Sequence, residues 1–253
     1  DKVVWALGSG TGIGAAGAEA LAGAGARVIL SGRRPEPLQD VAARIAEAGG
    51  EAHSEPLDIA DGAATSALGS AIVKRFGRID TMLNSAAINV PNRAWADYEE
   101  AGWEQVIDVD IKGALHCIAA VLPDMRRRRD GLIINISSWA GRYDSVIGGV
   151  AYTASKRAMM AMTTTVNMEE GRNGIRACAI CPAEVATPLI DKRAEPPPDW
   201  LKARMLQPQD LAETILYVAR MPPSVCVNEI LISPTWNRAY VGDEEPEVPT
   251  DAV

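Results

Sequence analysis

A tyrosine and a lysine four residues apart form the strongest chemical signal in this chain. On a helix, the spacing of Tyr152 and Lys156 places the phenol and the ammonium group on one face. A free phenol ionises at about pH 10, so it is a poor acid or base at neutral pH. A cation about 4 Å away, at an effective dielectric constant of about 20, stabilises the phenolate by roughly 4 kcal/mol. The spacing therefore predicts a general acid and base, and an exposed pair without a role in catalysis is the alternative.

Two serines follow an apolar run upstream of this pair. The run Leu132–Ile136 predicts a buried strand, and Ser137 and Ser138 come directly after it. Ligands of open α/β sheets bind beyond the carboxyl ends of the strands, so a hydroxyl here can hydrogen-bond a substrate oxygen that the phenol protonates. This position favours the catalytic interpretation of Tyr152 and Lys156.

A glycine-rich turn, Gly8–Gly14, connects the apolar run Val3–Leu7 to an Ala-rich helical segment. A backbone without Cβ atoms can approach a pyrophosphate closely, and the helix that follows supplies unpaired N–H groups and the positive end of its dipole. A turn with a purely structural role is the alternative. Because the glycines stand between a predicted strand and a predicted helix, we expect a nucleotide site.

The second apolar run, Val28–Leu30, is followed by Arg33 and Arg34 and by no acidic residue. NAD-binding proteins of this fold usually carry an acid here for the ribose 2′-hydroxyl, and a carboxylate would repel a 2′-phosphate. A guanidinium can hold that phosphate through two charge-assisted hydrogen bonds. We therefore expect a preference for NADP, with NAD possible, and with Arg33 as the main contact and Arg34 next. The alternative is that both arginines are merely solvated.

Short β-branched runs alternate with helical patterns along almost the whole chain. Continuous apolar runs are typical of strands covered on both faces, and strand–helix alternation favours a single-domain, doubly wound parallel sheet, Rossmann-like, with helices on both faces. The expected strands are Val3–Leu7, Val28–Leu30, His53–Leu57, Thr81–Leu83, Leu132–Ile136, Ile175–Ile180 and Glu229–Ile232. Helical patterns cover Ala15–Ala24, Pro37–Ala48, Ala63–Phe76 and Leu211–Ala219.

Two segments interrupt this alternation. The Pro-rich stretch 188–208 cannot form a continuous helix, and we expect a loop that shapes the substrate pocket. An acidic tail, 242–253, follows the last strand. The chain is thus expected to form one dinucleotide-binding and catalytic domain, 1–241, with this tail.

Composition limits the classes of partner. The 253 residues include 25 Lys and Arg against 33 Asp and Glu, a formal net charge of −8. Nucleic-acid binding needs clustered positive charge, and a membrane span needs about 18 apolar residues in a row, so we expect neither partner. The basic run Arg126–Arg129 is expected to close a helix, with nucleic-acid contact as the alternative. The four cysteines form no disulfide scaffold and fit a reducing cytoplasm.

The sequence predicts no metal site. Only two histidines are present, and Cys178 and Cys181, three residues apart on a predicted strand, should face opposite sides of the sheet. No second cysteine pair at zinc-binding spacing accompanies them.

Taken together, these motifs resemble the short-chain dehydrogenase/reductase family along nearly the whole chain. The glycine turn is similar to the family's Gly-x-x-x-Gly-x-Gly turn, and Tyr152 and Lys156 match its Tyr-x-x-x-Lys motif. The segment 84–87 resembles the family's Asn-Asn-Ala-Gly with two substitutions, and 182–187 resembles its Pro-Gly-x-x-x-Thr segment with Ala183 in place of the glycine. The resemblance implies cofactor contacts at Gly8, Gly12, Ile13, Gly14, Asp58, Ile59, Asn84, Ala86, Tyr152, Lys156, Val185 and Thr187.

The same resemblance assigns roles to the catalytic candidates. It implies that Ser138 positions the substrate oxygen, that Tyr152 transfers the proton, and that Lys156 assists Tyr152 and holds the ribose. Asp110 stands where the family has a fourth catalytic residue, an Asn whose backbone carbonyl holds a water beside the lysine and whose side chain supports a helix bend. A buried carboxylate at Asp110 without a partner is expected to take up a proton.

We therefore expect an oxidoreductase that moves a hydride between NADP(H) and a carbonyl or secondary-alcohol substrate. Asp110 and the altered segment 84–87 favour the alternative of a nucleotide-binding regulatory or scaffold protein, and a lyase or epimerase with a tightly held cofactor is a third possibility. The resemblance also implies a homotetramer or homodimer that pairs through helices at about Trp103–Arg128 and Tyr152–Glu170.

Overall fold

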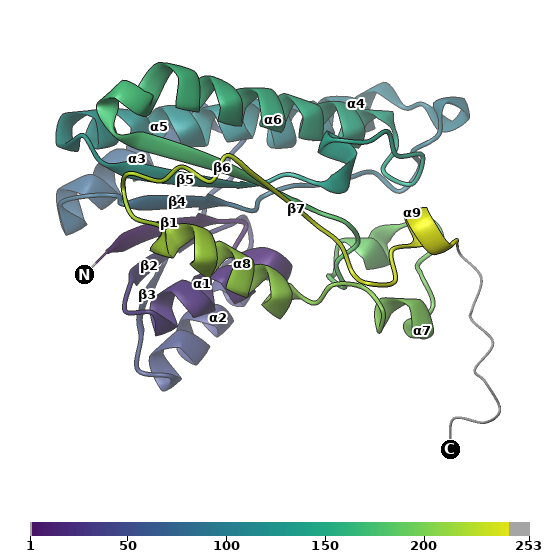
Figure 1. The fold of residues 1–253 in the computed structure, drawn as a ribbon, viewed down its shortest axis with the longest axis horizontal. Helices are drawn as coiled ribbons and strands as arrows, with labels where there is room; N and C mark the ends of the chain where they lie inside the picture. The colour runs from purple at the N-terminus through teal and green to yellow at the C-terminus, as the bar shows by residue number, and fades with distance from the viewer. Residues whose placement is uncertain (1, 243–253) are drawn as a thin grey trace.

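The protein is built on a seven-stranded parallel sheet with the order β3-β2-β1-β4-β5-β6-β7 (Figure 1). A computed structural model describes residues 2–242, and Asp1 and 243–253 lie outside it. The prediction of a doubly wound, Rossmann-like α/β fold is confirmed. The strands are β1 Val3–Leu7, β2 Arg27–Ser31, β3 Glu51–Ser54, β4 Thr81–Asn84, β5 Gly131–Ile136, β6 Ile175–Pro182 and β7 Glu229–Ile232.

Helices cover both faces of the sheet (Figure 1). One face carries α1 (Gly12–Gly23), α2 (Pro35–Glu47) and α8 (Pro208–Arg220), whose apolar side chains pack into one core. The other carries α3 (Gly62–Phe76), α5 (Ala114–Arg128) and α6 (Val150–Glu170), which pack into a second core. The helices α1, α2, α3 and α8 begin one to three residues before the predicted helical patterns and end within one residue of them.

Alternation along β1 shows why the strands are apolar throughout. Val4 and Ala6 belong to the core under α1 and α8, whereas Val3, Trp5 and Leu7 belong to the core on the opposite face. Successive side chains of a strand point to opposite faces, so a strand covered on both sides needs apolar residues at every position. The apolar runs therefore located six of the seven strands to within two residues.

The helix expected over Trp103–Arg128 is interrupted. It begins with α4 at Glu100–Val106, passes through a π-helical segment at Ile107–Gly113, and continues as α5. The predicted range is helical throughout, and the π-helical segment within it is a detail that the sequence pattern did not indicate. The second long helix is continuous as α6.

Two further predictions need correction or detail. The weak strand expected at His53–Leu57 is β3, two or three residues earlier, and the Leu57 N–H donates to the Gly32 carbonyl at 2.9 Å beyond the strand. The loop 188–208 contains the short helix α7 (Asp199–Lys202) and a small apolar cluster of Ile190, Leu201 and Met205. After β7 the chain forms α9 (Arg238–Val241), and the expected tail 242–253 lies outside the described residues except for Gly242.

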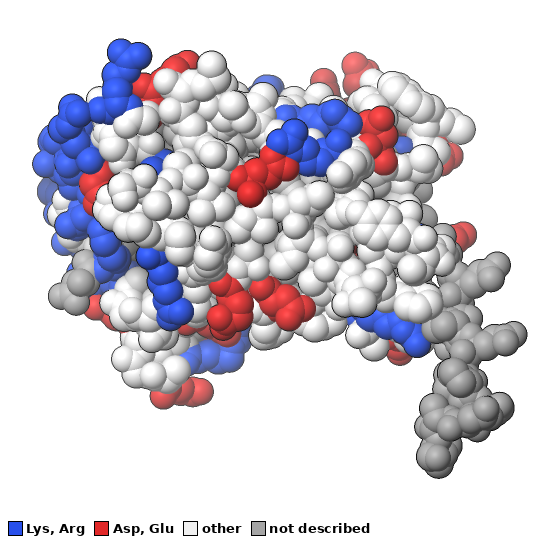
Figure 2. All heavy atoms as spheres, in the orientation of Figure 1, with Lys and Arg blue, Asp and Glu red and all other residues white. Residues whose placement is uncertain are grey.

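Basic side chains gather where α5 and α6 end, at the amino ends of the strands (Figure 2). In the run at the end of α5, Arg127 and Arg128 pair with Asp124, and Arg126 pairs with Glu170. This cluster lies at the opposite end of the sheet from the glycine turn. Among the described residues, no helix is long and apolar enough to cross a membrane.

Candidate active site

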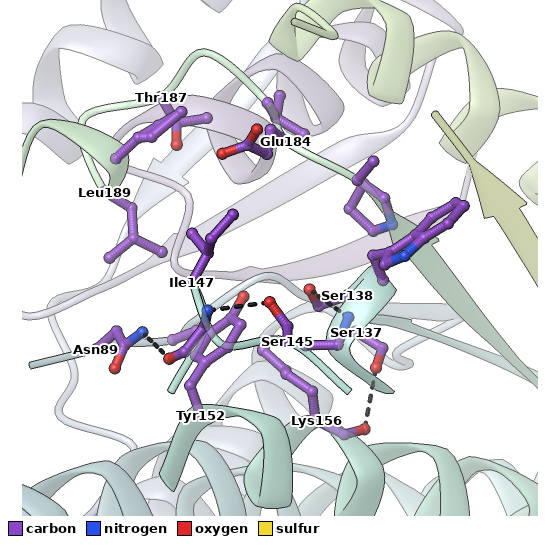
Figure 3. Close-up of a pocket in the computed structure, with 18 of the residues that line it drawn as sticks. Asn89, Ser137, Ser138, Ser145, Ile147, Tyr152, Lys156, Glu184, Thr187 and Leu189 are labelled. Atoms are coloured by element: carbon purple, nitrogen blue, oxygen red, sulfur yellow. Dashed lines mark hydrogen bonds between the residues drawn. The ribbon is translucent and has the colours of Figure 1, made fainter. Parts of the chain in front are cut away.

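A cavity of about 380 Å³ opens beyond the carboxyl ends of the central strands. Its walls come from the end of β5, the first turns of α6, and the segment that leaves β6. Figure 3 shows Ser138, Tyr152 and Lys156 on one side of this space and Glu184 and Thr187 on the other. The three residues expected to carry the chemistry therefore share one cavity, although 14 residues of chain separate Ser138 from Tyr152.

The two serines after β5 have different roles. Ser137 is buried and its hydroxyl donates to the Lys156 carbonyl at 3.1 Å, which fixes the end of the strand against α6. Ser138 has an extended backbone and lines the cavity, with its Oγ accepting the Ala140 N–H at 3.2 Å. The Ser138 hydroxyl proton is left to donate to a ligand in the cavity.

Tyr152 and Lys156 lie one turn apart on α6. The Lys156 Nζ lies 5.3 Å from the centre of the Tyr152 ring and donates to the Ile136 carbonyl at 3.1 Å. The Lys156 side chain is 1% exposed, so its charge acts in a poorly solvated environment. An ammonium group has three donors. The Ile136 carbonyl therefore occupies one of them, and the others remain for a hydroxyl-rich ligand.

Asp110 is fully buried in the π-helical segment behind these residues. Its Oδ1 accepts the Ile88 N–H at 2.8 Å, and its Oδ2 accepts the Ser155 hydroxyl at 3.3 Å. The expectation of a carboxylate without a partner was therefore wrong. Burial raises the pKa of the Asp110 carboxyl to about 6, while the Lys156 charge and the two hydrogen bonds act in the opposite direction.

The glycine turn lies at the switch point of the sheet, where β1 is paired with both β2 and β4. Gly8 has a φ of 71°, and a Cβ there would lie 2.5 Å from the Ala86 backbone nitrogen. A Cβ at Gly14 would overlap the Gly8 carbonyl oxygen. Both glycines are therefore required by packing, in addition to any ligand.

The first turn of α1 faces the cavity with free backbone donors. Ile13 lines the cavity, and Gly12 approaches Thr187 so closely that a Cβ would lie 3.1 Å from the Thr187 methyl carbon. The side chain of Thr11, which precedes α1, makes no capping hydrogen bond to any described residue. This uncapped helix start beside Thr187 fits a dinucleotide phosphate.

Most of the other predicted cofactor residues lie around this turn and outside the lining of the cavity. Arg33 and Arg34 are exposed beyond β2, and neither forms an ion pair within the described part of the chain. Asp58 is exposed, with Oδ1 accepting the Ala60 N–H at 3.0 Å, whereas Ile59 is buried in the core. The remaining residues stand close to the turn: Asn84 ends β4, Ala86 abuts Gly8, and Val185 and Thr187 line the cavity.

Several cavity residues could not be found by motif. Asn89 and Arg93 stand in the irregular segment after β4, and Arg193 and Arg238 stand in the loop after β6 and in α9. Glu184 belongs to the segment 182–187, but nothing in that motif indicated that its side chain enters the cavity. Trp139 also lines the cavity, and Tyr143 packs on its ring with the centroids 4.9 Å apart.

The cysteine pair on β6 is buried. Burial raises the pKa of the Cys178 thiol to about 12 and that of the Cys181 thiol to about 11. Zinc binds the thiolate, so both thiols are poor ligands in this environment. In the described part of the chain, no group of three or more His, Cys, Asp or Glu side chains could hold a metal ion.

Comparison with known proteins agrees with this geometry. The sequence model of the family described as short chain dehydrogenase matches residues 2–197. An uncharacterized oxidoreductase of Staphylococcus saprophyticus is 35% identical over 235 residues, which cover 92% of this chain and 97% of that protein. A metagenomic short-chain oxidoreductase solved with NADP is similar at 30% identity and a TM-score of 0.80, covering 92% of this chain and 97% of that one. Actinorhodin polyketide ketoreductase solved with NADPH has 27% identity and a TM-score of 0.83, covering 92% and 95%.

Proposed function

Because the chain belongs to the short-chain dehydrogenase/reductase family, we propose that it transfers a hydride between NADP(H) and a carbonyl or secondary-alcohol substrate. One observation carries this proposal. Ser138, Tyr152 and Lys156 reach the same cavity from the end of β5 and from α6, and the uncapped start of α1 opens onto it. The nicotinamide supplies the hydride donor or acceptor when bound, and the protein supplies orientation and the proton.

Each of the three catalytic candidates would make a different contribution to carbonyl reduction. The Ser138 hydroxyl donates a hydrogen bond to the carbonyl oxygen, and Tyr152 donates a proton to the same oxygen as the hydride reaches the carbonyl carbon. The buried Lys156 charge favours transfer of that proton, because it stabilises the negative charge that develops on the phenol oxygen. In alcohol oxidation the proton moves from the hydroxyl group to Tyr152.

The residues around the glycine turn fit the dinucleotide. Backbone N–H groups at Gly12, Ile13 and Gly14 would hold the pyrophosphate, and the unused donors of Lys156 would bind the nicotinamide ribose. Val185 and Thr187 would contact the nicotinamide end. Asp58, Ile59, Asn84 and Ala86 would complete the site toward the adenine and along β4.

NADP is the proposed cofactor, with NAD as a weaker ligand. The two exposed arginines after β2 support this choice, because each can donate to a 2′-phosphate. The similar structures solved with NADP and NADPH are consistent with it.

A ketone and secondary-alcohol panel tests the proposed reaction. Absorbance of reduced nicotinamide should fall with a ketone and NADPH, or rise with an alcohol and NADP, and Tyr152→Phe should abolish the change while nucleotide binding persists. A regulatory or scaffold protein that binds nucleotide without turnover is the second candidate, favoured by the buried carboxylate of Asp110. That candidate gains support if NADP binds and no substrate of the panel reacts.

We also propose that the protein forms a homotetramer or homodimer through α5 and α6. Leu115 on α5 is 48% exposed and Met168 on α6 is 76% exposed, so both helices present apolar surface. Light scattering at micromolar concentration tests this proposal, and a monomer would contradict it. All four cysteines are free thiols, which supports a reducing compartment such as the cytoplasm.

A further inference from the structure

Three arginines from separate segments line the cavity that holds the catalytic side chains. Arg93 comes from the loop after β4, Arg193 from the loop after β6, and Arg238 from α9. Three cations at one cavity need an explanation, because burying like charges together is costly unless anions offset them.

One carboxylate balances only part of this charge. Glu184 Oε1 accepts from the Arg193 Nη1 at 2.6 Å and from the Arg238 Nη2 at 2.8 Å. The other carboxylate at the cavity, Asp144, is 94% exposed and pairs with Arg157 at 2.9 Å. Lys156 adds a further positive charge beside Tyr152, with the buried Asp110 behind it. Arg93 and Arg193, with Glu184 as the carboxylate beside them, therefore form a wall with a net positive charge.

Arg93 is the arginine without an ionic partner. Its Nε donates to the Val90 carbonyl at 2.8 Å and its Nη1 donates to the Ile147 carbonyl at 2.9 Å. No carboxylate within the described residues pairs with it. Desolvation and the nearby charge of Arg193 lower the pKa of Arg93, and Tyr152 acts in the opposite direction. The guanidinium is thus held in place by two neutral acceptors, near both Arg193 and the catalytic phenol.

We propose that Arg93 and Arg193 bind a carboxylate group of the substrate, so that the enzyme acts on short hydroxy or oxo acids. The inference rests on the proposed hydride transfer for its redox chemistry and on the arginines for its choice of substrate. A planar guanidinium binds a carboxylate through two charge-assisted hydrogen bonds. The cavity of about 380 Å³ also receives the nicotinamide, which favours small acids as substrates.

The carboxylate itself takes no part in the redox step. In oxidation, the carbinol C–H bond breaks and its hydride passes to NADP, while the hydroxyl proton passes to Tyr152 and a C=O bond forms. Arg93 and Arg193 position the acid so that its carbinol carbon lies beside Tyr152. Glu184 acts as a positioning residue, because it fixes Arg193 and Arg238 without contacting the reacting atoms.

Matched acids and amides separate charge recognition from shape. We would measure binding of 2- and 3-hydroxybutanoate and of the corresponding amides by calorimetry, with Tyr152→Phe protein, in the presence and absence of NADP. The acids should bind at least about tenfold tighter than the amides, a difference of about 1.4 kcal/mol. Raising NaCl from about 0.05 to about 0.5 M should weaken binding of the acids and leave the amides unchanged.

Charge-removing variants identify the residues. In the Tyr152→Phe protein, Arg93→Gln and Arg193→Gln should each weaken binding of the acids at least about tenfold. Binding of the amides should weaken less than about twofold. Arg220→Gln removes an equal charge from an exposed site at the end of α8 and should change neither. Thermal unfolding of each variant shows whether the fold is retained.

The outcomes distinguish this proposal from the proposed reaction. Equal affinity for acid and amide, no binding of either acid, or equal losses for both ligands in the arginine variants would overturn the carboxylate site. If an arginine variant fails to fold, salt-sensitive binding of the acids to the Tyr152→Phe protein still supports the carboxylate site. If the acids bind as expected and wild-type protein with NADP never oxidises them, the carboxylate site stands and hydride transfer is contradicted.

Discussion

The carboxylate of Asp110 accepts the backbone N–H of Ile88 at 2.8 Å, which ties the π-helical segment to the chain that leaves β4. Its second oxygen lies 3.3 Å from the Ser155 Oγ, whose single proton is shared with the Tyr152 carbonyl at 2.8 Å. One buried side chain therefore joins three elements around the catalytic residues. An amide has nearly the same shape as a carboxylate but cannot ionise, so Asn at this position separates the effect of the hydrogen bonds from the effect of the charge.

Replacing Asp110 with Asn should change how stability depends on pH. Burial raises the pKa of Asp110 to about 6 in the folded protein, whereas an unfolded aspartate titrates at about 3.9. The folded state thus keeps a proton that the unfolded state loses, and this contribution is complete below about pH 4 and lost as the pH rises through 6. Relative to wild type, the Asn variant should gain about 2 kcal/mol of unfolding free energy between pH 4 and pH 7 in denaturant titrations. Parallel pH curves for the two proteins would contradict the burial argument.

The Ala variant of Asp110 provides the control. It removes the acceptor of the Ile88 N–H as well as the charge, and a buried unsatisfied donor costs about 1–3 kcal/mol. Asp110→Ala should therefore be less stable than Asp110→Asn at every pH in the same titrations. If the two variants unfold at the same denaturant concentration, the hydrogen bond to Ile88 contributes nothing measurable.

Catalysis should tolerate the Asn variant of Asp110. The amide oxygen can accept from Ile88 and the amide nitrogen can donate to Ser155, so kcat/KM should stay within about tenfold of wild type, or about 1.4 kcal/mol. Above pH 6 the wild-type carboxylate is charged near Lys156 and offsets part of its effect on the Tyr152 phenol. Alcohol oxidation by the variant should therefore begin at a slightly lower pH in a pH–rate profile. A loss beyond a hundredfold would mean that the carboxylate has a chemical role of its own.

The fold and the catalytic core could be predicted because local patterns encode them. The apolar run that became β5 ends at Ile136, two residues before Ser138, and helical spacing alone brought Tyr152 and Lys156 together on α6. The partner of Asp110 could not be predicted, because the Ile88 N–H belongs to an irregular segment whose position depends on tertiary packing. The charged wall of Arg93 and Arg193 could not be predicted for the same reason, since no periodicity connects two loops 100 residues apart.

Two glycines of α1 should respond in opposite ways to a methyl group. A Cβ at Gly14 would overlap the Gly8 carbonyl oxygen, which is backbone and cannot move without opening the turn. Gly14→Ala should therefore lower the free energy of unfolding by at least about 2 kcal/mol. Gly23, at the end of the same helix, has open space at its Cβ position. Because alanine has the higher helix propensity, Gly23→Ala should raise the free energy of unfolding by about 0.5 kcal/mol. Denaturant titration measures the change in unfolding free energy for both variants. An unchanged value for Gly14→Ala would show that the turn can relax.

Cofactor choice should depend on Arg33 more than on Arg34. Arg33 is exposed between the end of β2 and α2, and a charge-assisted hydrogen bond contributes about 1.5–3 kcal/mol. Arg33→Ala should therefore weaken NADP binding about 10- to 100-fold in calorimetric titrations. NAD binding should change by less than about twofold, because NAD lacks the 2′-phosphate that the guanidinium would hold.

Two comparisons make the cofactor prediction specific to the arginine beside the ribose. Arg34→Ala should have a smaller effect than Arg33→Ala, and Arg220→Ala, which removes a distant charge at the end of α8, should have none. Higher salt should weaken NADP binding more in wild type than in Arg33→Ala. Salt screens the ionic contact between Arg33 and the 2′-phosphate, and the variant lacks this contact. A wild-type protein that binds NAD more tightly than NADP, or an Arg33→Ala variant that binds NADP normally, would assign the 2′-phosphate to a different group. We expect instead that the loss is confined to NADP and to the arginines that follow β2.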